Sequence, residues 1–199
     1  MKLKQWLGQA LLAASVSSMV LASSAALAES AQTASAAAAL SFRGVGYWHR
    51  WSKNGQHEFT PEGQSDLQAW TDMVIVNVHR EVRTEEQLAG LANAVLGNYQ
   101  NAGKVLKTAS KPKTPDQLAE HLAVAVLGAP GVLEATFARF VLTDGVGTVI
   151  SYSHRVYGNA VGPAMNDWLK AYGAQVESAL MDWNNVPGPV ALGKLPQSR

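Results

Sequence analysis

Two segments with helical periodicity flank a run of strand-like segments, and this order constrains the fold more than any other feature. The first segment begins after Thr84, a good N-cap, with Gln87 at the capping-box position, and ends near Gly103. The second covers about residues 161–183 and carries one apolar stripe. Because helices and strands are segregated rather than strictly alternating, the order predicts an α+β fold.

Strand-like patterns account for most of the remaining chain. The turn-forming Asn54 and Gly55 predict a hairpin early in the chain, and Asp144 and Gly145 predict a later turn. Segment 118–127 has a helical alternative because Pro115 suits a helix N1 position, but the tight turn that follows favours a strand. We expect an antiparallel sheet of about five to six strands against two main helices. The candidate strands are residues 47–51, 57–60, 73–79, 118–127, 132–142 and 147–157, with residues 105–110 as an optional further strand.

The first 28 residues have the three-part order of a secretory signal. Lys2 and Lys4 precede an uncharged, largely apolar stretch, and Ala26 and Ala28 supply small residues before a cleavage point. A transmembrane anchor is the alternative, but Gln9 and several serines interrupt the run, whereas a span requires about 20 strongly apolar residues. The chain contains no cysteine, which excludes a lipoprotein anchor. We therefore expect cleavage near Ala28 and a periplasmic or secreted chain without stable membrane insertion.

The composition of the expected mature chain limits the classes of partner that we expect it to bind. Without cysteine there are no disulfides, and one domain of this length can bury a sufficient core without them. Cleavage would remove two of the 16 basic residues and none of the 15 acidic ones, leaving a formal charge of −1. Nucleic acid is therefore not expected as a partner. We expect a flexible leader over 29–41, a single domain over 42–186 and an irregular tail over 187–199.

The order of elements resembles the PsbP-like fold group, which includes small secreted bacterial proteins such as the DcrB-like ones. The resemblance covers residues 47–183: an N-terminal strand pair, strand 73–79, the helix after Thr84, a long meander and a C-terminal helix containing Trp168. It rests on element order and transfers no functional residue. Members mostly act as accessory or binding proteins, so the resemblance implies an unknown small ligand or protein partner rather than catalysis.

His121, Glu134 and His154 form the strongest candidate for chemistry. With regular alternation and turns near residues 129 and 145, these side chains and Thr136 would share one sheet face. Imidazole and carboxylate groups suit general acid/base catalysis or a divalent metal. The alternative is that they form cross-strand hydrogen bonds beneath a helix. No metal-ligand motif or cofactor motif is present, so no cofactor is expected.

Four further residues are candidates for ligand binding. Arg139 and Arg155 would share the opposite face with Glu120, Ser151 and Ser153, and either arginine suits recognition of an anion, although charge pairs across a sheet are commonly structural. Tyr157 belongs to the same unusual string as Ser153 and His154, two neighbours that point to opposite faces and so form no dyad. Trp48 and Trp51 also face opposite sides, so one could anchor a ligand.

We therefore predict an exported, non-catalytic accessory protein that binds a ligand or partner. The alternative is a metal- or His-dependent enzyme that uses His121, Glu134 and His154. An effector or immunity partner in bacterial competition is compatible with the size and export, but no residue favours it. The chain has no GxSxG elbow and no cysteine nucleophile, so its motifs do not indicate a hydrolase.

Overall fold

A computed structural model describes residues 39–198 of the chain. The expected signal segment 1–28 and leader residues 29–38 lie outside the described residues. Within them the elements follow in this order: β1 (Ala39–Phe42), β2 (Val45–Lys53), β3 (Gln56–Pro61), β4 (Asp72–His79), α1 (Glu85–Ala102), β5 (Gly103–Lys111), β6 (Glu120–Ala129), β7 (Val132–Thr143), β8 (Val146–Tyr157), α2 (Val161–Met181) and α3 (Pro189–Leu192).

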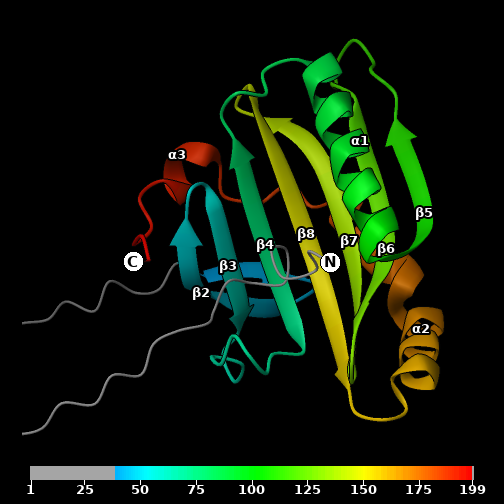
Figure 1. The fold of residues 1–199 in the computed structure, drawn as a ribbon. Coiled ribbons are helices and arrows are strands. Elements are labelled where there is room, and N and C mark those ends of the chain that lie inside the picture. Colours follow the sequence, from blue (N-terminus) through cyan, green and yellow to red (C-terminus); the bar gives the residue numbers. More distant parts are fainter. Residues whose placement is uncertain (1–38, 199) are drawn as a thin grey trace, which may run out of the picture. The chain divides into compact units, whose positions relative to one another are not determined.

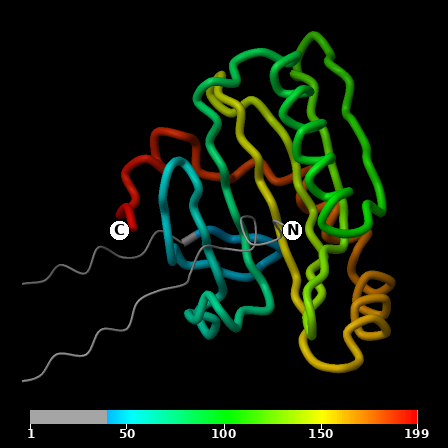
Figure 2. The backbone as a smooth tube through the Cα atoms, viewed as in Figure 1, coloured from blue at the N-terminus to red at the C-terminus, as the bar shows by residue number. Residues whose placement is uncertain are grey.

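The described strands form one antiparallel sheet in the order β1-β2-β3-β4-β8-β7-β6-β5. The α+β class is confirmed, but the sheet has eight strands rather than five to six. The uncounted strand β1 begins at Ala39, inside the expected leader, and pairs with β2. Figure 2 follows the path: after β4 the chain crosses through α1 to the far edge strand β5, and β6, β7 and β8 return toward β4.

The two main helices pack on opposite faces of the sheet (Figure 1). On one face, Leu88 and Val95 of α1 pack against a small core that includes Phe140. On the other, α2 covers a larger core that includes Val124 and Phe137 and continues under the β1–β2 hairpin. Each face of the central strands β6, β7 and β8 is therefore buried, which explains their long apolar runs.

The turns and caps explain why the sequence pattern predicted these elements. Asn54 and Gly55, and again Asp144 and Gly145, adopt positive φ in two-residue hairpin turns. Thr84 accepts a hydrogen bond from the Gln87 backbone N–H in the expected capping box of α1. Residues 120–129 form a strand, as the tight turn favoured. The tail also contains the short helix α3, which was not expected.

Within residues 39–198, no helix is both long enough and apolar enough to cross a membrane.

Candidate functional site

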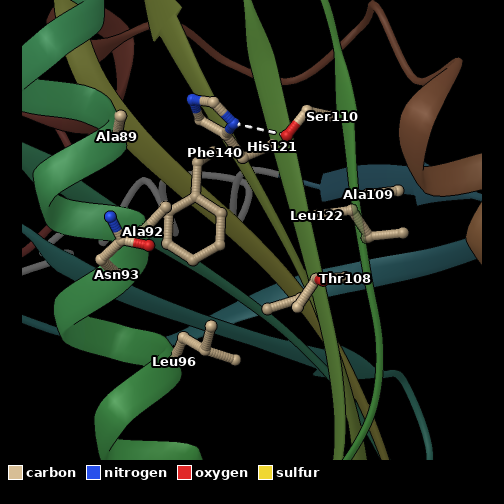
Figure 3. A pocket seen from close by; sticks show the side chains of 11 residues that line it. Ala89, Ala92, Asn93, Leu96, Thr108, Ala109, Ser110, His121, Leu122 and Phe140 are labelled. Carbon is tan, nitrogen blue, oxygen red and sulfur yellow. Dashed lines mark hydrogen bonds between the residues drawn. The ribbon is translucent and has the colours of Figure 1, made fainter.

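A groove lies between α1 and the edge strand β5 (Figure 3), with a volume of about 290 Å³. Helix α1 supplies one wall, β5 supplies the other, and β6 and β7 supply the floor. The side chains that define it are Ala89, Asn93 and Leu96 from the helix, Thr108 and Ser110 from β5, and His121 and Phe140 from the floor. The groove therefore combines an apolar base with several uncharged hydrogen-bonding groups.

Small side chains on α1 keep this groove open. Leu88 and Val95 are buried and attach the helix to the sheet. Ala89 and Ala92, which also line the groove, reach toward the sheet with only a methyl group. A helix with large apolar residues at these positions would close the space against β5.

His121 is the polar centre of the groove. The β5–β6 register places Ser110 directly opposite it, and its Nδ1 lies 2.8 Å from the Ser110 hydroxyl oxygen. The second ring nitrogen, Nε2, is buried and has no hydrogen-bond partner among the described residues. In Figure 3 this nitrogen is turned toward α1. Buried polar atoms are nearly always paired in folded proteins, so an unpaired one in a groove indicates a position for a bound group.

The structure does not bring His121, Glu134 and His154 together. Glu134 does face the α1 side with His121. It lies six positions along β7 from Phe140, the residue opposite His121, which is about 20 Å of strand. His154 faces the α2 side, so the expected shared face is wrong for it. The β7–β8 turn is centred between Asp144 and Gly145 rather than on one residue, and this shift exchanges the faces of β8.

The same shift moves Arg155, Ser151 and Ser153 to the α1 side, so they do not share a face with Glu120 and Arg139 as expected. Arg139 is only 5% exposed and forms a two-bond pair with Glu120, at 2.9 and 2.7 Å. Its remaining nitrogen donates to the carbonyl of Leu180 in the last turn of α2 and to that of Trp183 just after the helix. These contacts occupy the guanidinium and tie α2 to the sheet.

The other ligand-binding candidates also have partners within the chain. Arg155 donates to Glu134 at 2.8 Å, and its guanidinium carbon lies 3.9 Å from the centre of the Trp70 ring. The Tyr157 hydroxyl donates to the Trp70 carbonyl oxygen, although the side chain is 46% exposed. Together these two residues hold the loop before β4 against the sheet. Trp48 is half-buried and lies over Gly46, where an added Cβ would meet its ring at 2.9 Å.

His154 belongs to a different polar network, centred on Asp72 at the start of β4. The Asp72 carboxylate accepts hydrogen bonds from four side chains: Tyr152 at 2.6 Å, His154 at 3.0 Å, Thr71 at 2.9 Å and Gln64 at 3.2 Å. Burial alone would raise the pKa of Asp72, but these hydrogen bonds outweigh it and lower that pKa to about 2. Since the carboxylate is ionised, Nδ1 of His154 must donate to it.

The ring of His154 also stacks on Trp168 of α2, with centroids 4.1 Å apart and planes inclined by 4°. Asp72 and Trp168 therefore fix the imidazole on two sides. This arrangement joins β4, β8 and α2.

Two further histidines converge on one hydroxyl group. His49 Nε2 and His57 Nδ1 lie 2.6 and 2.7 Å from Ser52 Oγ. Burial lowers the pKa of both imidazoles, which keeps them neutral. No third ligand joins them, and across residues 39–198 no three His, Asp or Glu side chains gather closely enough to hold a metal ion.

The sequence pattern identified His121 but missed the residues around it. Thr108 and Ser110 alternate on β5, which is a signal for one polar strand face, but strand pairing was needed to place them beside His121. Ala92 was interpreted as an ordinary member of the apolar helical stripe, and no sequence signal identified Ala89. Asp72 was missed because it comes just before the apolar run of β4 and because two of its four partners, Tyr152 and His154, are distant in sequence.

No family model matches the chain, and no curated protein matches it. Among solved structures the chain is similar to Mog1p, a Ran-binding protein of Saccharomyces cerevisiae whose fold belongs to the same group as PsbP. The TM-score is 0.41 and the sequence identity 15%, over 67% of this chain and 78% of Mog1p. We draw nothing about ligand, partner or activity from a similarity at this level.

Proposed function

We propose that the chain is a non-catalytic binding protein that holds a small molecule in the groove between α1 and β5. The observation that carries this proposal is the buried, unpaired Nε2 of His121 inside a groove of about 290 Å³. Leaving such an atom unpaired costs about 1–3 kcal/mol, a cost that a ligand hydrogen bond would remove. Concave sites with an apolar base and a few polar groups are typical of small-molecule binding.

The proposal includes export and membership of the PsbP-like group. Export is supported by the charged, apolar and small-residue order of residues 1–28, and group membership by the order of elements. When the full chain is expressed in a bacterium with a secretion pathway, mass spectrometry of the released protein should show an N-terminus at Glu29. Full-length protein retained inside the cells would contradict export.

We do not propose a catalytic function, because the described residues place His121, Glu134 and His154 on different faces or far apart. An accessory role with a protein partner would require a docking surface, whereas the groove is a site of small-molecule size.

Filling the groove should abolish binding without unfolding the protein. In the Ala89→Leu variant the larger side chain would occupy the space beside His121. A library of fragments of about ten non-hydrogen atoms can be screened by NMR on the ¹⁵N-labelled protein. Fragments that shift the His121 ring signals of the native protein should not shift those of the Ala89→Leu variant.

Ala94→Leu is the matched control, because Ala94 lies exposed on the same helix and does not line the groove. This variant should bind the same fragments as the native protein. Equal binding by the Ala89→Leu variant would show that the fragments lie elsewhere.

Replacing His121 should separate binding from stability. The His121→Leu variant removes the unpaired Nε2, while the exposed Ser110 can turn to water. We expect the free energy of unfolding without ligand to rise by about 1 kcal/mol, and fragment binding to be lost. Urea unfolding measures the first effect. The NMR screen measures the second on the backbone amide signals of Ser110 and Leu122, because the variant has no His121 ring. A loss of several kcal/mol would instead assign His121 a structural role.

A further inference from the structure

We propose that the ligand of this groove is uncharged and bears an amide or hydroxyl group that bonds Nε2 of His121. This inference rests on the proposed binding function and specifies the chemical class of the ligand. Three observations support it: the side chains that line the groove are uncharged, the neighbouring charged groups point away from it, and the Ser110–His121 pair can present a donor or an acceptor.

None of the side chains that line the groove is Asp, Glu, Lys or Arg. The polar groups are the Asn93 amide, the hydroxyls of Thr108 and Ser110, and the imidazole of His121. A charged ligand would leave water on entering and would meet no opposite charge in return, which makes its binding unfavourable. A neutral polar molecule loses less hydration and finds donors and acceptors on three sides.

The nearby charges are directed elsewhere. Thr108 and Ser110 face the groove, whereas Lys107 and Lys111 of the same strand reach acidic groups on the α2 side. The Lys107 ammonium lies 2.6 Å from Glu177, and the Lys111 ammonium donates to the carbonyl of Met181 at 3.0 Å and to Asp182 at 3.4 Å. These cations are therefore turned away from a ligand in the groove.

The carboxylate of Glu85, in the first turn of α1, also has partners within the chain. Glu85 accepts hydrogen bonds from Lys113 at 2.9 Å and from the backbone N–H of Ala119 at 2.8 Å. Neither this carboxylate nor that of Glu86, the other acidic residue of this turn, lines the groove. A cationic ligand would therefore find no acidic partner there.

The Ser110 hydroxyl allows His121 to present either a donor or an acceptor. If the hydroxyl donates to Nδ1, the ring proton is on Nε2, and if it accepts from Nδ1, Nε2 carries a free lone pair. An amide or a hydroxyl contains both kinds of group and can pair with either form. Leu96 and Phe140 offer apolar contacts for the rest of the ligand.

Three probes of one size and shape test the charge: benzamide, benzoate and benzamidinium. At pH 8, where a free imidazole is neutral, each is titrated into the ¹⁵N-labelled protein and the His121 ring signals are followed by NMR. The groove volume of about 290 Å³ corresponds to roughly ten water volumes, so the probes match it in size. We expect benzamide to bind at least about tenfold more tightly than either ion. The Ala89→Leu variant should lose the benzamide shifts and the Ala94→Leu control should keep them.

Benzoate or benzamidinium binding as tightly as benzamide in the groove would overturn the assignment of a neutral ligand while leaving the binding function intact. Absence of any benzamide shift, when other fragments do shift His121, would have the same meaning. If no probe and no library fragment shifts His121, the binding function itself fails and the ligand class with it.

Discussion

The Arg139→Met variant is expected to lose about 3–5 kcal/mol of unfolding free energy, because the change breaks a buried ion pair and leaves one charge behind. Among the residues that the structure describes, Glu120 would keep only its weak contact with Gln117, at 3.3 Å. The carbonyls of Leu180 and Trp183 would lose the donor that fixes the end of α2. Urea unfolding at pH 7 measures the loss.

Two companion variants locate the cause of this effect. The double variant Arg139→Met with Glu120→Leu should recover much of the stability, because no unpaired charge remains. Arg139→Lys should fall between the native protein and Arg139→Met, since lysine keeps the charge but lacks the planar guanidinium fork that bonds both carboxylate oxygens of Glu120. A loss below about 1 kcal/mol for Arg139→Met would place the pair among weak surface interactions.

The Asp72→Asn variant is expected to lose about 2 kcal/mol at pH 7 and to differ less from the native protein as pH falls. The hydrogen bonds to Asp72 lower its pKa from 3.8 to about 2. Between these values the folded protein binds fewer protons than the unfolded chain, so this carboxylate stabilises the fold above about pH 4. That contribution is lost as pH falls through about 2, at about 1.4 kcal/mol per pKa unit. Urea unfolding at pH 7, 4 and 2.5 should therefore show a shrinking difference.

Asp116→Asn provides the control for that series, because Asp116 is an exposed loop residue. Its stability should stay within about 0.5 kcal/mol of the native value at every pH. A constant difference between the native protein and Asp72→Asn from pH 7 to 2.5 would contradict the lowered pKa.

Local signals in the sequence were sufficient to predict most of the elements. Thr84 with Gln87, and the Asn54–Gly55 turn, act through hydrogen bonds and positive φ within a few residues, so their effect survives in any tertiary context. The shared face of Glu120 and Arg139 was predicted correctly, although the β6–β7 turn lies at Pro130 and Gly131 rather than near residue 129.

The features that the sequence pattern did not predict depend on contacts between distant parts of the chain or on a one-residue shift of strand register. Strand β1 is short and follows an alanine-rich segment, and its turn uses Arg43 at positive φ, a residue type that rarely marks one. The predicted sheet face of His154 was wrong because side chains alternate along a strand, so a register shift of one residue at the turn exchanges the two faces. The groove forms because Ala89 of α1 lies beside the edge strand β5, which follows α1 in the chain. Only the sheet topology determines this placement.

The most direct test of the central claim is a crystal structure of the protein soaked with a mixture of small fragments. The binding function predicts electron density for a fragment between α1 and β5, with a polar atom within hydrogen-bond distance of Nε2 of His121 and apolar atoms against Leu96 or Phe140. Fragments found only at other positions, with water alone on Nε2 or with α1 closed against β5, would contradict it.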